Sequence, residues 1–453
     1  MKTVVKELKR NVDVIVGMQH GDEGKGKIIN ELCCDYDVNV RFNGGANSGH
    51  TMYDSNGNKV VMNVLPSGMI NKNITGVITQ GVVINPFAFI EETERVEKSV
   101  VDLYERLYIS ADAHLTVPSH ILIDYFTEAH RQKGGTQKIG STNRGNTPTY
   151  VDRVARRGLR VSDIKRDDFK SLYMTLVNSH IDYIKGMFGI SEHEIYNTKI
   201  GELSLKDYEH QWHDAVIKMG MKFKVCNTVS LLHKFISAGA SVLVEGAQGC
   251  MLDVEYGTYP YVTSSSVTAS AAFAQTGIPV QCVNKIFGVF KPYVTRVGSG
   301  FFPTQIVAEP YMKSLEHIAT LGKEFGSVTG RARKLGWLDM PQLKYACMIN
   351  GVTDLIMMKA DMLSELPTEV LVCDSYSYGN SIPHKHDIYK GEEDFICANY
   401  KQFPKVGVLF PTLSDELYHL IEYIDGYMSE VITKPTVSIV SHSPTFVSTA
   451  IVS

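Results

Sequence analysis

The sequence predicts an α/β fold with a large, mostly parallel central sheet and surrounding helices. Three observations support this prediction. Short β-branched runs alternate with amphipathic stretches along the whole chain, as strands and helices do in this fold class. Glycine-rich segments follow the first two predicted strands, and ligands bind at such strand ends in parallel sheets. No Pro-, Ser- or Gly-rich stretch divides the chain, so residues 1–453 are predicted to form a single domain, with a mainly helical insertion near residues 100–240.

The predicted elements follow in chain order. The first strand, residues 12–16, reads V-D-V-I-V and leads through a glycine-rich turn into a helix at residues 28–34. Further runs rich in valine, isoleucine and leucine predict strands at residues 38–42, 76–84, 241–245, 355–359 and 437–440. Apolar residues at helical spacing predict helices at residues 89–107, 167–187, 228–238 and 413–428.

Composition and charge restrict the class of protein. Of the 453 residues, 44% are hydrophobic and 21% are charged, which is typical of a globular chain and not of a disordered one. The 45 basic and 49 acidic residues give a net charge of −4, so neither nucleic acid nor an anionic membrane is expected as a partner. The eight cysteines form no C-x-x-C pair, and residues 1–10 do not resemble a signal peptide. We therefore expect a cytoplasmic protein with reduced thiols.

The loop after the first predicted strand has the features of a phosphate-binding loop. It reads G-M-Q-H-G-D-E-G-K-G-K, and its part from Gly21 to Lys27 fits G-x-x-x-x-G-K. Glycines let backbone N–H groups approach phosphate oxygens, and the following helix N-terminus favours their negative charge. Ile28 stands where such a loop usually has a Ser or Thr that binds magnesium, and the carboxylate of Asp22 lies inside the loop instead. A carboxylate facing a polyphosphate is sensible as a metal ligand or as a base.

A second glycine-rich loop follows the second predicted strand. Residues 43–51 read N-G-G-A-N-S-G-H-T, and two such loops would lie side by side at one edge of a parallel sheet. Histidine titrates near neutral pH, so His50 is a candidate general acid. A histidine after a glycine is by itself more often a turn residue, but the neighbouring phosphate loop favours the functional interpretation.

Together the two loops resemble the adenylosuccinate synthetase family. The resemblance continues in order along nearly the whole chain, on the segments I-G-S-T-N-R-G (139–145), V-A-R-R-G-L-R-V (154–161), E-G-A-Q-G (245–249), G-T-Y-P-Y-V-T-S-S (257–265), T-R-V-G-S-G (295–300), G-S-V-T-G-R-A-R-K-L-G-W-L-D (326–339) and K-A-D (359–361). The resemblance implies a homodimer that couples GTP hydrolysis to the joining of IMP and L-aspartate, with Mg²⁺ required.

The resemblance also implies roles for particular residues. Asp22 would remove the N1 proton of IMP and ligate Mg²⁺, together with the Gly49 carbonyl. The 6-oxygen would then attack the γ-phosphate of GTP, and the aspartate amine would displace phosphate from the 6-phosphoryl intermediate. His50 would donate a hydrogen bond or proton, and Lys25 would stabilise the transferring phosphoryl group. Gln248 completes the expected catalytic set.

The expected binding residues fall into three groups. IMP would be bound by Asn47, Thr142, Arg156, Gln248, Thr263 and Arg331, with Arg156 reaching the site of the partner subunit. L-Aspartate would be bound by Val328, Thr329, Arg331 and Arg333. GTP would be bound by Gly21, Gly24, Lys25, Gly26, Lys27, Gly49, Thr51, Arg333, Lys359, Asp361, Ser441 and Ser443.

The sequence departs from the family pattern mainly near its end. The family usually carries S-T-G-P-D-R around the guanine, whereas residues 441–446 read S-H-S-P-T-F. Asn143 and Val328 also replace a usual glycine and threonine. Three alternatives therefore stay open: a paralogue that acts on another purine nucleotide such as dGMP, an enzyme that uses ATP as donor, and a non-catalytic nucleotide-binding relative. Viral relatives that act on dGMP typically replace the loop aspartate, so the presence of Asp22 favours IMP.

Overall fold

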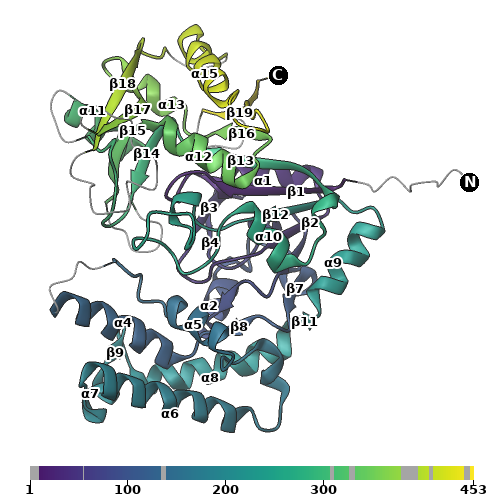
Figure 1. The fold of residues 1–453 in the computed structure, drawn as a ribbon. Coiled ribbons are helices and arrows are strands. Elements are labelled where there is room, and N and C mark those ends of the chain that lie inside the picture. Colours follow the sequence, from purple (N-terminus) through teal and green to yellow (C-terminus); the bar gives the residue numbers. More distant parts are fainter. Residues whose placement is uncertain are drawn as a thin grey trace, which may run out of the picture.

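A ten-stranded sheet forms the centre of the molecule, in the order β11-β7-β5-β2-β12-β1-β13-β16-β19-β20 (Figure 1). Its strands are β1 (Val12–Gly17), β2 (Val38–Arg41), β5 (Thr75–Ile78), β7 (Leu107–Ser110), β11 (Lys224–Cys226), β12 (Val242–Glu245), β13 (Val283–Phe290), β16 (Asp354–Met357), β19 (Thr436–Ser441) and β20 (Thr449–Ile451). Every neighbouring pair is parallel except β19 and β20. The predicted fold class is confirmed. This computed structural model describes residues 10–54, 56–133, 139–306, 311–325, 332–378, 396–407, 412–442 and 449–452.

The central strand β1 shows that both faces of the sheet are covered. Alternate residues of a strand point to opposite faces. Val14 and Val16 belong to one hydrophobic cluster, whereas Ile15 packs in another with Ile28 and Ile29 of helix α1 (Lys25–Leu32). Burial on both faces explains the nearly continuous apolar run of this strand.

One strand prediction needs correction, and one central strand is missing from the predicted set. The predicted strand at 76–84 is too long, because β5 ends at Ile78 and a separate strand β6 (Val83–Ile84) pairs with β8 (His114–Leu115). A tight turn separates the two, and a Cβ at Gly81 would lie 2.1 Å from the carbonyl oxygen of Phe42. Strand β13, which lies between β1 and β16, is missing from the predicted set because the first half of its sequence is polar and partly exposed.

The predicted helix at 89–107 is also too long. It consists of α2 (Pro86–Val96), a turn, the short helix α3 (Leu103–Arg106) and the first residue of β7. Asp102 has φ 51°, a left-handed conformation that interrupts a regular helix. The other predicted helices correspond to α1, α6 (Phe169–Phe188), α9 (Thr228–Ser237) and α15 (Asp415–Met428).

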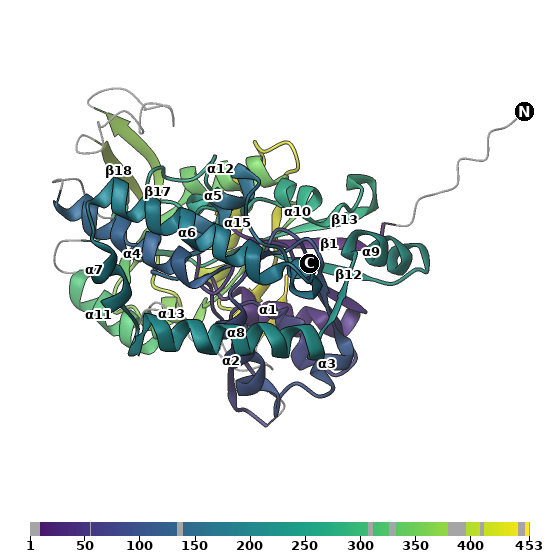
Figure 2. The ribbon, with the colours of Figure 1, turned by 90° about the horizontal axis from the view of Figure 1, so that it is seen from below.

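A helical region lies on the side of the sheet away from the C-terminal strands (Figures 1 and 2). It contains α4 (Pro118–Lys133), α5 (Asn146–Ala155), α6, α7 (Glu192–Asn197) and α8 (Leu205–Lys222). Helix α4 packs against α5 and α6, and α8 packs against α2. Trp212 is fully buried among them, and its indole N–H donates to the Thr116 carbonyl at 2.9 Å. The division of the chain into domains stays a prediction.

A second, four-stranded sheet lies near β16 and β19, the strands from the C-terminal part of the chain (Figure 1). Its order is β14 (Tyr293–Arg296), β15 (Lys334–Asp339), β17 (Val370–Tyr378) and β18 (Ile396–Phe403). Among the described helices, none combines the length and apolarity needed to cross a membrane. The small sheet matters for the site because Arg333, just before β15, reaches the loop after β1.

Candidate active site

The loops that follow four neighbouring strands meet at one edge of the central sheet. Strand β1 lies between β12 and β13, and β12 also pairs with β2. All four are parallel, so their carboxyl ends lie on the same edge, where α/β proteins bind ligands. The two glycine-rich loops predicted from the sequence therefore both lie at this edge.

The loop after β1 is built around a buried carboxylate. Glu23 is fully buried and accepts hydrogen bonds from the backbone N–H groups of Gln19 (3.1 Å) and Gly21 (2.9 Å). Its other oxygen pairs with Lys25 Nζ at 2.5 Å, which holds this predicted catalytic lysine inside the loop. Gly21 and Gly24 have φ of 82° and 95°, which L-residues with a side chain rarely adopt. The loop then enters α1, whose N-terminal N–H groups face the same edge.

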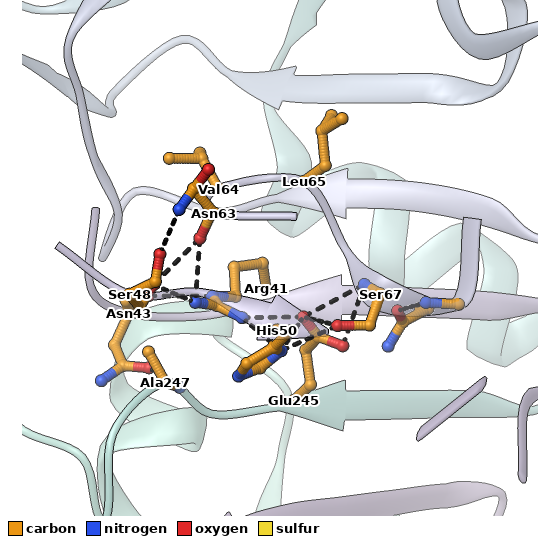
Figure 3. A network of polar contacts seen from close by, with 12 residues as sticks. Arg41, Asn43, Ser48, His50, Asn63, Val64, Leu65, Ser67, Glu245 and Ala247 are labelled. Atoms are coloured by element: carbon orange, nitrogen blue, oxygen red, sulfur yellow. Dashed lines mark hydrogen bonds and ion pairs between the residues drawn. The ribbon is translucent and has the colours of Figure 1, made fainter. Parts of the chain in front are cut away.

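The loop after β2 is anchored by an ion pair buried between two strands. Arg41 at the end of β2 pairs with Glu245 at the end of β12 at 2.9 Å, and both side chains are buried (Figure 3). The remaining guanidinium N–H groups of Arg41 donate to Ser48 Oγ at 2.7 Å and to the Asn63 carbonyl at 3.2 Å. The ion pair therefore fixes the segment that carries Asn47, Gly49 and His50.

The protonation of His50 follows from its neighbour Arg41. Arg41 Nη1 lies 3.1 Å from His50 Nδ1 (Figure 3), and a guanidinium can only donate, so Nδ1 accepts and the proton is on Nε2. Burial, together with the charge of Arg41, lowers the pKa of His50 to about 4, although Glu245 opposes this shift. His50 is therefore neutral near pH 7 and can donate a hydrogen bond through Nε2–H, which is the first of the two roles predicted for it.

Asp22 is brought together with Arg333, 311 positions further along the chain. Arg333 Nη2 and Nε lie 2.7 and 3.0 Å from Asp22 Oδ2, and Arg333 Nη1 also pairs with the buried Glu324. The side chain of Asp22 is 26% exposed, and within the described residues its Oδ1 has no hydrogen-bond partner. A partly exposed carboxylate oxygen of this kind suits a magnesium ion or a proton.

The residues predicted for the guanine also gather at this edge. Lys27 Nζ donates to Ser441 Oγ at 2.6 Å, and the Ala360 N–H donates to the Ser441 carbonyl at 2.9 Å. Lys359 Nζ donates to the Gly322 carbonyl at 2.8 Å. Burial raises the pKa of Asp361, while the charges of Lys27 and Lys359 oppose that rise. The phosphate loop, the end of β16 and the end of β19 are therefore neighbours at this edge of the central sheet.

The predicted IMP residues are only partly connected. Gln248 has φ 60°, and its Nε2 donates to Asn47 Oδ1 at 3.3 Å, which joins the loops after β12 and β2. Thr142, Arg156 and Thr263 are not joined to these two by any side-chain hydrogen bond within the described residues. Arg156 is exposed at the end of α5 with φ 63°, and Thr142 and Thr263 are half-buried.

The other predicted residues need only brief description. Thr51 on β3 (His50–Tyr53) and Gly49 just before it are half-buried. A Cβ at Gly26 would lie 2.8 Å from the Cβ of His50, so this glycine allows α1 to pack on β3. Val328, Thr329, Arg331 and Ser443 lie outside the described residues.

Several charged residues of the site are missing from the predicted set. They are Glu23, Arg41, Glu245, Lys291 and Glu324, all buried. The sequence did mark two of them, because Arg41 and Glu245 are charged residues within predicted strands that are rich in valine. Buried charges of this kind need a partner. Arg41 and Glu245 are each other's partners and lie 204 positions apart. The sequence could therefore indicate that each is a buried charge, but not that the two form a pair.

A histidine cluster in the helical region is a hydrogen-bonded network and not a metal site. His120, Asp152 and His180 bring three ligand-type atoms within 4.8 Å of one another. The Val117 N–H donates to His120 Nδ1 at 3.0 Å, which leaves the ring proton on Nε2, where it is donated to Asp152 at 2.9 Å. A nitrogen that carries a proton cannot bind a cation.

The chain is similar to known proteins over nearly its whole length. Residues 14–443 match the family model described as adenylosuccinate synthetase. The adenylosuccinate synthetase of Flavobacterium johnsoniae is 42% identical over 437 residues, which cover 96% of this chain and 98% of that protein. That of Flavobacterium psychrophilum is 43% identical over the same length, with the same shares covered.

Two solved structures also resemble the chain. A fully ligated adenylosuccinate synthetase from Plasmodium falciparum has a TM-score of 0.85 at 30% identity and covers 98% of this chain and 100% of that one. The succinoaminodeoxyadenylate synthetase of cyanophage S-2L, bound to dGMP and dATP, has a TM-score of 0.60 at 18% identity and covers 98% and 95%. At that identity the second similarity shows a shared fold alone. The chain therefore belongs to the adenylosuccinate synthetase family, whose members are ligases that form a C–N bond.

Proposed function

We propose that this protein joins IMP and L-aspartate to give adenylosuccinate, while GTP is converted to GDP and phosphate. The family membership supports the reaction class. The observation that carries the proposal is the Asp22 carboxylate inside the phosphate loop, with one oxygen paired to Arg333 and the other oxygen available. A simple nucleotide-binding loop has no need of a base at this position.

The first step transfers a phosphoryl group to IMP. Asp22 takes the N1 proton, and the electron pair this releases lets the 6-oxygen attack the γ-phosphorus of GTP, from which GDP leaves. His50 donates a hydrogen bond from Nε2–H as charge builds up on the phosphate oxygens, and Lys25 adds a positive charge beside the loop. Asp22 and the Gly49 carbonyl would hold Mg²⁺, which when bound supplies charge neutralisation to the phosphates.

The second step forms the C–N bond. The amine of L-aspartate attacks C6, the C–O bond breaks, and phosphate leaves with the electron pair of that bond and takes up the proton that the amine nitrogen loses. Arg333 would bind a carboxylate of L-aspartate once it releases Asp22, because a guanidinium can contact a carboxylate through two parallel N–H groups. Val328, Thr329 and Arg331 complete the proposed aspartate set.

We also assign binding residues to the two nucleotides, IMP and GTP. Asn47, Thr142, Gln248, Thr263 and Arg331 would bind IMP. Asp361 would accept from the N1–H and 2-amino groups of guanine, which adenine does not offer, and Lys359 would lie beside the base. Gly21, Gly24, Gly26, Lys27, Thr51, Ser441 and Ser443 would complete the GTP site.

The proposed assembly is a cytoplasmic homodimer. Arg156 has an exposed side chain with no hydrogen-bond or ion-pair partner in the described parts of the chain, which suits a residue that binds the IMP phosphate of a partner subunit. The whole chain would form one domain.

The test is a spectrophotometric assay with matched substrates. Purified protein with IMP, L-aspartate, GTP and Mg²⁺ should produce adenylosuccinate, and Asp22→Asn should abolish turnover while leaving the melting temperature unchanged. Asp168→Asn is the matched control, because Asp168 is an exposed carboxylate whose side chain pairs, within the described part of the chain, only with Arg166. Product from dGMP but not from IMP would contradict the proposal. Equal rates with ATP and GTP would contradict the role of Asp361, and this comparison matters because residues 441–446 depart from the family pattern.

A further inference from the structure

One buried carboxylate, that of Glu324, has four polar partners. Oε1 lies 2.7 Å from Lys359 Nζ, 3.3 Å from Lys291 Nζ and 2.6 Å from the Tyr293 hydroxyl. Oε2 accepts from Arg333 Nη1 and lies 3.4 Å from Lys291 Nζ. Glu324 follows helix α11 (Tyr311–Leu321), and its partners come from β13–β14, the start of β15 and the end of β16.

Three cations contact Glu324, which is more than its own single charge requires. One lysine would balance one carboxylate, and each further buried charge costs desolvation energy. Lys291 and Glu324 are both fully buried, and burial lowers the pKa of Lys291 to about 7. The three cations together hold the pKa of Glu324 well below its usual range, although burial alone would raise that pKa. Lys291 is thus the structural partner of Glu324, whereas Lys359 and Arg333 also belong to the proposed site, where Arg333 pairs with Asp22.

Lys359 and Arg333 belong to different parts of the proposed site. Lys359 is assigned to the guanine side, and Arg333 to L-aspartate, with two of its nitrogens on Asp22. Glu324 therefore touches one residue from each part. If Lys359 shifts when the nucleotide binds, it neutralises a different share of the negative charge of Glu324. The attraction between Glu324 and Arg333 then changes, and so does the strength with which Arg333 is held on Asp22.

We propose that Glu324 is a positioning residue that couples the donor-nucleotide side of the site, at Lys359, to Arg333 and the dicarboxylate it binds. The inference rests on the proposed function for the assignment of the two sides. It goes beyond that function because Glu324 is buried, is assigned to neither substrate, and would act through the two cations.

The main test is a binding measurement on Glu324→Gln, which keeps the shape of the side chain and removes its charge. Calorimetry on the whole protein, with Mg²⁺ and IMP present, gives the affinity for GDP with and without succinate as the dicarboxylate probe. Wild-type protein should bind GDP more tightly with succinate present, and Glu324→Gln should lose this difference.

Steady-state kinetics gives a second readout. In the Glu324→Gln variant, KM for L-aspartate and for GTP should each rise about tenfold, as expected when one charge-assisted hydrogen bond is lost, with KM for IMP changed less. Glu365→Gln, an exposed glutamate near Lys359 in the chain, is the matched control.

The outcomes separate the two proposals. If wild-type protein makes no adenylosuccinate, the proposed function fails, whereas the GDP and succinate measurement still tests the coupling. If Glu324→Gln lowers the melting temperature but keeps the effect of succinate on GDP affinity, Glu324 has only a structural role and the inference is overturned. Should this variant not fold, Lys359→Met provides the second test. It should raise KM for L-aspartate, although Lys359 is not assigned to that substrate, and an unchanged KM would overturn the coupling.

Discussion

Gly26 shows how closely the two loops of the site are packed. A side chain at this position would begin 2.8 Å from the Cβ of His50 and 3.1 Å from the carbonyl oxygen of Thr51. Both of these atoms belong to β3, whose Met52 is buried in the core on the same face as His50, so β3 cannot move away freely. The phosphate loop and His50 can therefore pack this closely only because residue 26 has no side chain.

Gly26→Ala should destabilise the protein and lower kcat. Overpacking at such a contact costs about 1–3 kcal/mol, and it would displace His50 from the phosphate loop. Urea unfolding gives the change in the free energy of unfolding, and the assay with IMP, L-aspartate and GTP gives kcat. Gly186→Ala, in the exposed last turn of α6, is the control, because a Cβ there meets no atom within 4 Å. It should be neutral or stabilising, and a Gly26→Ala enzyme with normal kcat would mean that His50 does not depend on this contact.

At the scale of elements, Asp152 ties three helices together. His120 of α4 and His180 of α6 both donate to Asp152 of α5, at 2.9 and 2.8 Å, and Arg157 contacts its other oxygen at 2.7 Å. Burial alone would raise the pKa of Asp152, but the hydrogen bonds from the two histidines hold it below its usual range. The network ends next to Arg156, so it also fixes the end of α5 from which that arginine leaves.

The stability of this helical region should fall as the pH is lowered. Burial lowers the pKa of His120 from 6.5 to about 4 in the folded protein. Between these two pH values the unfolded chain binds a proton that the folded protein does not, so lowering the pH favours unfolding. His120→Gln should reduce the loss of stability between pH 7 and pH 5 by about 2 kcal/mol. Urea unfolding at the two pH values checks this, with His210→Gln on the exposed side of α8 as control. An unchanged pH dependence would show that His120 does not remain neutral.

The elements also show what the sequence could and could not predict. Strands such as β1 and β12 were predictable because burial on both faces requires continuous β-branched residues. β13 was not, because its first residues are exposed at the sheet end and read as a loop. For the site, glycine spacing predicted both loops, and the family resemblance supplied the residue roles. The contacts of Glu324 were not predictable, since three chain segments converge on it and no local pattern marks such convergence.

At the scale of the whole molecule, local cations compensate for the overall charge. The chain has a net charge of −4, yet two nucleotides and a dicarboxylate are all anionic. Lys25, Arg333 and Lys359 lie at the same edge of the sheet, each already paired with a glutamate or aspartate. This pairing keeps the site close to neutral before its ligands bind, and Arg156 of a partner subunit would add one more cation.

Mixing two inactive variants tests that partner contribution. If Arg156 acts across a dimer interface, Arg156→Ala and Asp22→Asn should each be nearly inactive alone. A mixed dimer would contain one site with both wild-type residues, so random reassortment should restore about a quarter of wild-type activity. The assay is run after joint unfolding and refolding, with each variant refolded alone as control. No recovery of activity would mean that Arg156 does not serve the partner's site.

The position of β1 in the middle of the sheet has a consequence for biosynthesis. Val12 pairs with Val242 on one side and with Val283 on the other, so the strand that precedes the phosphate loop has both its neighbours more than 220 positions downstream. During translation at about 5–20 residues per second, this valine-rich strand would wait on the order of 15–60 s before β13 leaves the ribosome. Until then its unpaired backbone is a template for association with other chains. The nascent chain is therefore expected to depend on chaperones that bind its first 20 or so residues, a requirement that ends only when the sheet closes around β1.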